Sequence, residues 1–254
     1  MILALDVGNT NIVIGCIENQ DIYFESRIST DTEKTDTEYA VIFKNLLDIY
    51  DVDLSRIDGA IISSVVPQIT NSLKSAIFTV TGSEPVEIDY RSNHGLKIDP
   101  KNPEEVGNDL IVGAVAALKE YKAPLIIFDF GTATTISVID DENSFRGVSI
   151  LPGIKTSMNA LFKNAAQLSA IRLEAPESVI GTNTVEAVQS GIVFGNVCMV
   201  DGMIERIEKE LGKKATIIAT GGLANVILKY SKHDIIYDDS MLLKGLWYLY
   251  EMNK

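Results

Sequence analysis

The chain has 254 residues, of which 46% are hydrophobic, and a formal net charge of −13 at pH 7. That length suits one large domain or two of about 125 residues, either of which can bury a substantial core. The negative charge opposes binding to nucleic acid or to an anionic membrane. It leaves nucleotide binding open, because backbone N–H groups and metal ions neutralise phosphates.

The sequence also excludes several other classes of protein. With only two histidines, the sequence has no Cys/His spacing typical of a metal site, and we expect both thiols, Cys16 and Cys198, to be buried and reduced. The longest apolar run, 125–138, is interrupted by Asp129 and is too short to span a membrane. Because no basic segment follows Met1, we expect a cytoplasmic protein rather than a secreted one. The phosphate-binding patterns GxxxxGK[ST] and GxGxxG are absent from the sequence.

The first predicted element is a β-hairpin within residues 1–17. An apolar run ends at Asp6, the turn Gly8-Asn9-Thr10-Asn11 follows, and a second apolar run begins. Glycine lets a phosphate approach the backbone, the amides and the hydroxyl are donors, and the carboxylate can hold a hydrated Mg²⁺. The same residues also suit a purely structural turn, since Asn and Gly are common in turns.

Alternating and helical patterns then predict the rest of the first half. They are a strand over 21–29, a helix over 36–50, a buried and parallel strand over 59–65, a helix from Pro67 to about residue 80, and a brief strand over 86–88. The loop that follows contains His94, which we expect to be a surface residue.

A helix is predicted from Pro103 to about Tyr121, and it contains Asp109. The segment turns small and apolar directly after this carboxylate. An acid at such a boundary can face a cleft and act as a general base. The simpler interpretation is a solvated acid in the first turn, which the helix dipole favours.

The second half of the chain repeats the opening pattern. Residues 125–139 again form an apolar strand, an Asp-x-Gly turn and an apolar strand, so that Asp129 matches Asp6 and Gly131 matches Gly8. The repeat predicts two copies of one domain, 1–122 and 123–254, each with an anion-binding hairpin. The predicted boundary is Ala123-Pro124.

Further elements of the second half follow from the same reasoning. A third strand is expected over 144–151, then a helix over 154–165, a long helix from Thr184, its predicted cap, to about Leu211, a strand over 215–219 and a last helix over 240–252. The long helix contains Gly191, Gly195 and Gly202. Because each costs about 1 kcal/mol relative to Ala, we expect close packing of a ligand or of another helix to compensate. Gly221-Gly222 suits either a ligand approaching the backbone or a plain tight turn.

Together these motifs resemble those of type III pantothenate kinases, within the acetate kinase, sugar kinase, Hsp70 and actin superfamily. The resemblance covers essentially the whole chain. It rests on Asp-x-Gly-Asn-Thr from Asp6, Pro-Glu-Glu-Val-Gly-x-Asp ending at Asp109, Asp-Phe-Gly-Thr-Ala-Thr from Asp129, the segment from Gly147 to Pro152-Gly153, Gly-Thr-Asn-Thr ending at Thr184, and Thr220-Gly-Gly. It implies an α/β fold of two ribonuclease H-like (actin-like ATPase) domains with mixed sheets flanked by helices. It also implies a homodimer with its interface near the long glycine-bearing helix, and ATP-dependent phosphorylation of the primary hydroxyl of pantothenate, the first step of coenzyme A biosynthesis.

The resemblance also implies roles for individual residues. Asp109 is the expected catalytic base, Asp6 lies near Mg²⁺, and Asp129 helps to bind a monovalent cation, K⁺ or NH4⁺. The residues expected at ATP are Asp6, Val7, Gly8, Asn9, Thr10, Asn11, Ile12, Val13, Thr132, Gly221 and Gly222. The residues expected at pantothenate are Gly107, Asn108, Asp109, Leu110 and Thr184.

Three positions depart from the family pattern. The family usually has Arg, which would pair with the substrate carboxylate, where this chain has Leu110; it often has Tyr at Pro100 and has Gly at Val148. Lys155, Lys163 and Arg172 are candidate replacements for the missing cation. Alternative interpretations therefore stay open: a non-catalytic, nucleotide-binding regulatory paralogue, or a kinase for another small alcohol.

Overall fold

The computed structural model describes residues 1–99, 101–164 and 171–254, and the chain forms two compact units. Unit 1 combines Met1–Leu96 with the segment that ends at Lys119 and with Ser240–Lys254. Unit 2 combines Lys97–Asp99 with Glu120–Asp239.

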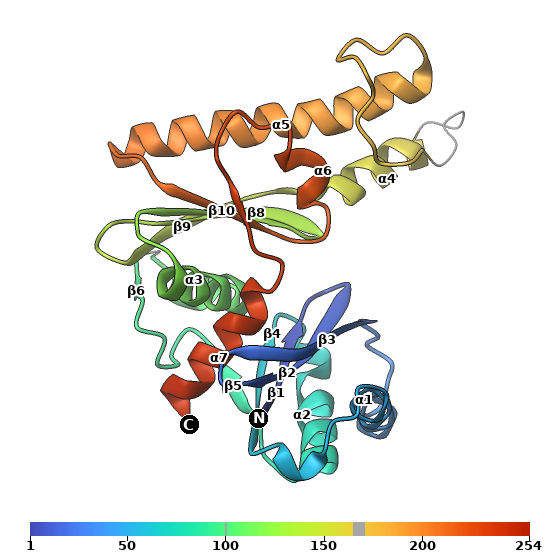
Figure 1. Ribbon diagram of the computed structural model, residues 1–254, viewed down its shortest axis with the longest axis vertical. Helices are drawn as coiled ribbons and strands as arrows, with labels where there is room; N and C mark the ends of the chain where they lie inside the picture. The colour runs from blue at the N-terminus through green and yellow to red at the C-terminus, as the bar shows by residue number, and fades with distance from the viewer. Residues whose placement is uncertain (100, 165–170) are drawn as a thin grey trace. The chain divides into compact units, whose positions relative to one another are not determined.

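Five strands form the sheet of unit 1, in the order β3-β2-β1-β4-β5 (Figure 1). β1 (Ile2–Val7) pairs antiparallel with β2 (Asn11–Glu18), which pairs antiparallel with β3 (Asp21–Ser29). β4 (Gly59–Ser64) runs parallel to β1 on its other side, and β5 (Val86–Ile88) runs parallel to β4. All six residues of β1 are buried, which explains why the sequence opens on an unbroken apolar run.

Helices α1 (Asp36–Ile49) and α2 (Pro67–Thr81) pack on each other and on this sheet. Thr35 caps α1 through a reciprocal pair of hydrogen bonds with Glu38, and Pro67 occupies the first turn of α2. Tyr39 of α1 is fully buried in the shared core. The 3₁₀ turn η1 (Leu54–Arg56) precedes β4.

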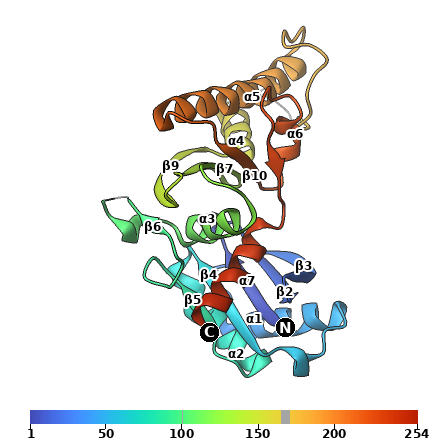
Figure 2. The same cartoon turned by 60° about the vertical axis from the view of Figure 1, so that its left-hand side comes forward.

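Helices α3 (Asn108–Glu120) and α7 (Met241–Asn253) complete unit 1. α7 crosses β1, β2, β4 and β5 (Figure 2), and Gly59 of β4 leaves room for the ring of Tyr250. The two helices also touch, because a Cβ at Gly245 would overlap the backbone of Val112. Before α3 lies the separate 3₁₀ turn η2 (Pro103–Glu105), so the predicted continuous helix from Pro103 is wrong, and Asp109 lies in the first turn of the true helix.

Six strands form the sheet of unit 2, in the order β11-β10-β7-β8-β9-β6. Their bounds are β6 Lys97–Ile98, β7 Leu125–Phe130, β8 Ala133–Ile139, β9 Ser144–Pro152, β10 Thr216–Thr220 and β11 Ile236–Tyr237. β7-β8-β9 is an antiparallel meander, and β10 runs parallel to β7.

The order β9-β8-β7-β10-β11 repeats the order β3-β2-β1-β4-β5, with the same directions for each strand pair that both sheets share. In both sheets an Asp is the penultimate residue of the first strand of a meander, and a small hydroxyl residue lies beside it on the parallel neighbour: Ser63 beside Asp6, and Thr220 beside Asp129. This duplication confirms the predicted fold class, two ribonuclease H-like α/β repeats.

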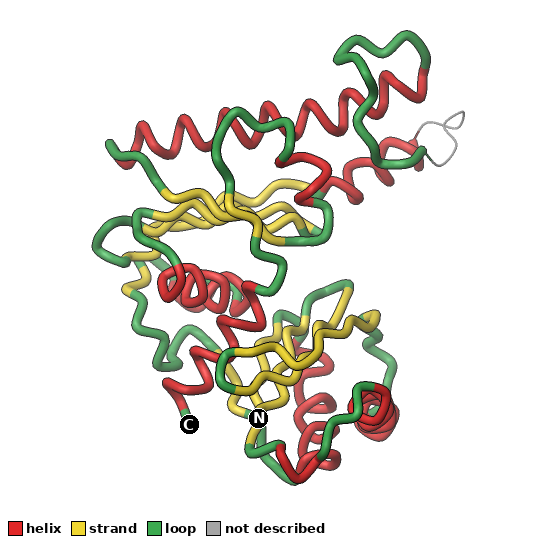
Figure 3. The backbone as a smooth tube through the Cα atoms, viewed as in Figure 1, coloured by secondary structure: helices red, strands yellow, loops and turns green. Residues whose placement is uncertain are grey.

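Helices α4 (Ile154–Asn164), α5 (Thr184–Leu211) and α6 (Ala224–Leu228) belong to unit 2, and Figure 3 traces them as separate red segments. Apolar side chains of α5 pack with Phe128 of β7 in one core. Among the described residues, α5 is the one helix whose length and composition would permit a membrane span, and 33% of that window is buried.

Several smaller expectations are corrected. Asn183, not Thr184, caps α5, since its side chain accepts from the Glu186 N–H. Cys198 is exposed, whereas Cys16 is buried. The compact units also differ from the division 1–122 and 123–254, because α7 packs on the sheet of unit 1 rather than in the second half. Residues 165–170, which include the predicted end of the helix over 154–165, lie outside the described residues.

Candidate functional site

The first Asp-x-Gly hairpin ends in a closed, solvent-facing turn. The Gly8 N–H donates to the Asn11 carbonyl at 3.0 Å, and the side chains of Asn9, Thr10 and Asn11 are exposed. Thr30, just beyond β3, holds the turn from outside: its hydroxyl donates to the Gly8 carbonyl at 2.6 Å, and its N–H donates to the Thr10 carbonyl at 3.0 Å. The sequence analysis missed Thr30, because nothing local marks a contact over 20 residues away.

The residues around that turn differ sharply in exposure. Asp6, the penultimate residue of β1, has only 7% of its surface exposed. Val7 and Ile12 are buried in the core of unit 1, and Val13 is half-buried. Val7 and Ile12 can therefore meet a ligand only through their peptide groups, while Asp6 contributes a carboxylate at the strand end.

The second hairpin is braced by the start of α4. Asp129 is half-buried near the end of β7, and Thr132 is exposed at the turn. The Thr132 carbonyl accepts from the Gly153 N–H at 3.2 Å and from the Thr156 hydroxyl at 2.8 Å. A Cβ at Gly153 would overlap that carbonyl, so glycine is required for the approach.

The glycine pair after β10 lies at the same edge of the unit 2 sheet. Thr220, the last residue of β10, is paired with Asp129 of β7. Gly221 has φ +95°, and a Cβ there would lie 2.7 Å from the Phe130 carbonyl oxygen, so no other residue fits without strain. Gly222 is exposed, and the sheet edge thus combines a carboxylate, an exposed hydroxyl-bearing turn and accessible backbone.

Asp109 lies half-buried at the start of α3. Its Oδ1 accepts from the Leu110 N–H at 2.9 Å, and no basic side chain of the described residues forms an ion pair with it. Burial raises the pKa of the Asp109 carboxyl above its ordinary value, although the backbone hydrogen bonds oppose the shift. Gly107 leaves space for the carboxylate, because a Cβ there would lie 2.5 Å from Oδ1. A desolvated, unpaired carboxylate is the form that a general base takes.

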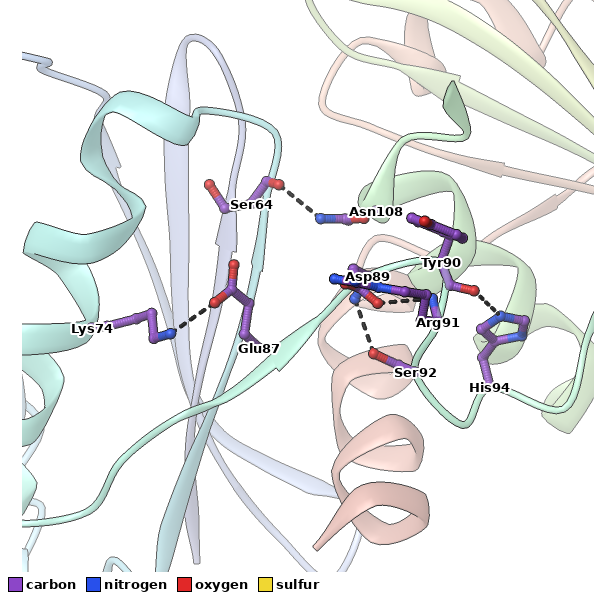
Figure 4. A network of polar contacts seen from close by, with 9 residues as sticks. All are labelled: Ser64, Lys74, Glu87, Asp89, Tyr90, Arg91, Ser92, His94 and Asn108. Atoms are coloured by element: carbon purple, nitrogen blue, oxygen red, sulfur yellow. Dashed lines mark hydrogen bonds and ion pairs between the residues drawn. The ribbon is translucent and has the colours of Figure 1, made fainter. Parts of the chain in front are cut away.

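The neighbouring Asn108 reaches the end of β4. Its side-chain amide donates to the Ser64 carbonyl at 3.0 Å (Figure 4). The Ser64 hydroxyl in turn accepts from the Val66 N–H at 3.1 Å and from the Thr70 hydroxyl at 2.8 Å. The sequence could not predict this contact, because Ser64 and Asn108 are 44 positions apart and approach each other only in the folded protein.

The family-pattern substitutions lie in both units. Leu110 is half-buried in unit 1, and Val148 in β9 is 37% exposed. The three candidate cations, Lys155, Lys163 and Arg172, are exposed in unit 2. Pro100 lies outside the described residues.

Thr184 lies at the rim of a cavity in unit 2. The cavity has a volume of about 520 Å³ and is lined by Leu161 of α4 and by residues 181–184, 187, 188, 191 and 192 at the start of α5. Thr184 itself is exposed. The cavity is large enough for a small organic molecule.

His94 is half-buried, and its ring is hydrogen-bonded within the loop rather than free at the surface. Its Nδ1 accepts from the Leu96 N–H at 3.1 Å, and its Nε2 lies 3.1 Å from the Tyr90 carbonyl (Figure 4). These two partners correspond to a neutral ring with the proton on Nε2. The ring thus holds the loop that follows β5.

Comparison of the sequence with known protein families identifies the family of this chain. A family model described as type III pantothenate kinase matches residues 2–206. The chain belongs to the type III pantothenate kinase family.

Curated members of the type III pantothenate kinase family match at full length. One from Exiguobacterium sp. (strain ATCC BAA-1283 / AT1b) is 43% identical over 254 residues, covering 100% of both chains. Another from Finegoldia magna is 42% identical over 257 residues, covering 100% of this chain and 98% of the relative. The solved structure of (R)-2-hydroxyglutaryl-CoA dehydratase component A from Acidaminococcus fermentans is similar in fold, with a TM-score of 0.57 at 13% identity over 98% of this chain and 96% of that one.

Proposed function

We propose that this member of the family transfers the terminal phosphoryl group of ATP to the primary hydroxyl of pantothenate, with Asp109 as the base. ATP-dependent phosphorylation of pantothenate, in the biosynthesis of coenzyme A, is the activity that its family membership gives the chain. The observation that carries the assignment of the base is the Asp109 carboxylate at the start of α3, half-buried and without a basic partner among the described side chains.

Asp109 accepts the proton of the attacking hydroxyl. Its raised pKa makes the carboxylate a better proton acceptor than a solvated one. Phosphoryl transfer otherwise depends on positioning and on charge neutralisation, so that one well-placed carboxylate suffices as the acid–base group. Gly107, Asn108 and Leu110 flank it and would line the acceptor site, Asn108 through its backbone, because its side-chain amide donates to the Ser64 carbonyl.

The two Asp-x-Gly turns would bind the phosphates of ATP. The exposed Asn9, Thr10 and Asn11 of the first and Thr132 of the second offer side-chain donors. Gly8 would let the phosphates approach through its missing side chain, because its N–H and carbonyl are already hydrogen-bonded to Asn11 and Thr30. Gly221 and Gly222 would lie against the adenosine. The proposal is supported by the closed geometry of both turns, which fixes these groups before a ligand arrives.

Asp6 would hold Mg²⁺ and Asp129 a monovalent cation, K⁺ or NH4⁺. Mg²⁺ usually binds proteins through one or two carboxylates together with waters and substrate phosphates. That pattern suits a strand-end Asp6, since no group of three His, Cys, Asp or Glu among the described residues could hold a metal by itself. When bound, Mg²⁺ neutralises the charge on the phosphates.

A homodimer through α5 is part of the proposal. Gly191, Gly195 and Gly202 have no atom within 4 Å of a built Cβ, so the close packing expected at these glycines is not supplied by the described residues of this chain. A second copy of the chain would bury them and offset their cost to the helix. Static light scattering at micromolar concentration should therefore give twice the mass of the 27.7 kDa chain. We also propose a cytoplasmic location, which accords with a metabolic enzyme.

The test is ATP turnover with Mg²⁺, K⁺ and pantothenate, followed by mass analysis of the product. The wild type should yield pantothenate heavier by one phosphoryl group, and Asp109→Asn should lose this product while still binding ATP. A fully active Asp109→Asn enzyme would exclude the assigned base.

One observation favours a second candidate, a kinase for another small alcohol. Leu110 is apolar where the family pattern has an Arg, and so it offers no charge to the carboxylate of pantothenate. Pantothenol, which has an alcohol in place of that carboxylate, is the informative comparison. Turnover with pantothenol but not with pantothenate would support the altered acceptor, and ATP binding without turnover of either would support a regulatory paralogue.

A further inference from the structure

We propose that Asn108 is a positioning residue, which holds the Asp109 carboxylate in place by tying the start of α3 to the end of β4. The inference rests on the proposed role of Asp109. Asn108 needs no contact with substrate for this, because it acts through the helix on which its neighbour lies.

The carbonyl that accepts from Asn108 belongs to Ser64, a residue that is itself held by several hydrogen bonds. Ser64 pairs with Val7, so the accepting carbonyl lies at the end of β4, next to the strand that leads into the first phosphate-binding turn. The Val65 N–H donates to the Val7 carbonyl at 3.0 Å, and the Ser64 hydroxyl is bonded to Val66 and Thr70 of the adjoining segment. A single hydrogen bond of 3.0 Å from Asn108 thus ties the helix that carries the base to the sheet that carries the turn (Figure 4).

The helix start does not need this bond for its own integrity. The Gly107 carbonyl accepts from the N–H groups of Leu110 and Ile111, at 3.0 and 3.2 Å. The Asp109 carboxylate accepts from Leu110 as well. Asn108 is the first residue of α3 rather than its cap, and its amide donates away from the helix, to the Ser64 carbonyl. Removing the amide should therefore leave α3 folded and packed, while its first turn, which carries Asp109, loses one of its anchors and can shift slightly.

Such a shift would act on catalysis rather than on binding of ATP. A displacement of about 1 Å at a reacting group can cost about 100-fold in rate. Loss of one of several anchors should cost less. We expect Asn108→Ala to lower kcat about tenfold, with the KM for ATP unchanged within a factor of two.

Two further variants separate positioning from general stability. Asn102→Ala is the matched control, because Asn102 is an exposed residue just before η2 whose amide donates to the nearby Glu105 at 2.7 Å. It should retain the wild-type kcat. Asn108→Gln keeps the donor on an arm that is one methylene longer, and it should recover part of the rate lost in Asn108→Ala.

The deciding experiment places Asn108→Ala in an Asp109→Asn background and follows residual product by mass. A residue that acts through Asp109 has no further effect once that carboxylate is gone, whereas a structural one costs the same factor in both backgrounds. The inference is overturned by a wild-type kcat in Asn108→Ala, or by equal losses in the two backgrounds. If the Asp109→Asn background is too slow to measure, the absence of any recovery in Asn108→Gln overturns it. If Asp109→Asn is active, the proposed base is refuted. If Asp109→Asn is inactive but Asn108→Ala is fully active, only the positioning role of Asn108 is refuted.

Discussion

Replacing Gly107 by Ala should impair catalysis while leaving the fold intact. The new Cβ would lie 2.5 Å from Oδ1 of Asp109, far inside van der Waals contact. The atom it meets is the end of a side chain, so the carboxylate can rotate away, and the backbone of Gly107 is outside the left-handed region that favours glycine. The fold therefore tolerates the methyl group, and the Asp109 carboxylate moves to make room for it.

The magnitude follows from that displacement. Oδ1 has to move by about 1 Å to reach ordinary contact distance, which costs about 100-fold in kcat if Asp109 is the base. The move also breaks the 2.9 Å hydrogen bond from Leu110, worth about 1.5–3 kcal/mol for a charged acceptor. A smaller gain of about 0.4–1 kcal/mol comes from the reduced entropy of the unfolded chain.

The assay compares kcat and the thermal midpoint of Gly107→Ala with those of Gly113→Ala. Gly113 lies within α3, the helix that begins directly after Gly107, and a Cβ there would be 3.6 Å from Met241, an ordinary contact. Gly113→Ala should keep its kcat and gain up to about 1 kcal/mol from helix propensity. Wild-type kcat in folded Gly107→Ala would refute the proposal that the position of this carboxylate limits the rate.

Three other predictions follow from the same site. Leu110→Arg should lower the KM for pantothenate about tenfold and leave that for pantothenol unchanged, as steady-state kinetics with both acceptors can check. Thr30→Val removes the hydroxyl bond to Gly8, worth about 1 kcal/mol, and should raise the KM for ATP about fivefold without altering kcat; an unchanged KM would count against the turn as a phosphate site. Because burial raises the folded-state pKa of Asp109, its ionised form destabilises the fold above that pKa, and stability falls as pH rises from the ordinary carboxyl pKa through the folded one. Asp109→Asn should accordingly raise the thermal midpoint at pH 7, and this gain should disappear at pH 3, whereas an equal gain at both pH values would show that the carboxylate's charge is not its cause.

Much of the fold could be predicted because its signals are local. The two meanders alternate or run apolar over their whole length, and the Asp-x-Gly turns recur with the same spacing, so the topological repeat follows from the sequence. The start of α3 was harder: Pro103 opens a 3₁₀ turn that resembles a helix start, and the true helix begins only at Asn108.

The features that the sequence did not predict are contacts between residues that lie far apart along the chain. Thr30 and Ser64 bond to residues 22 and 44 positions away, and neither belongs to a recognisable pattern. The amphipathic character of α7 predicted a helix, but not that it packs on strands formed some 200 residues earlier. The residues proposed for the site could therefore be selected from the sequence, whereas the groups that hold them in place could not.

The position of α7 has a consequence for synthesis of the chain on the ribosome. Unit 1 contains both the first strands and this last helix, which fills the space at Gly59 with Tyr250 and packs against α3 through Gly245. At about 5–20 residues per second, the helix is made on the order of 10 seconds after Lys119. During that interval one face of the first sheet lacks the helix that covers it, while the strands β7 to β11 and the helices α4 to α6 of unit 2 are being made. The unit encoded first is thus completed last, and a nascent-chain complex truncated before Met241 is the state in which that sheet would be open to chaperones.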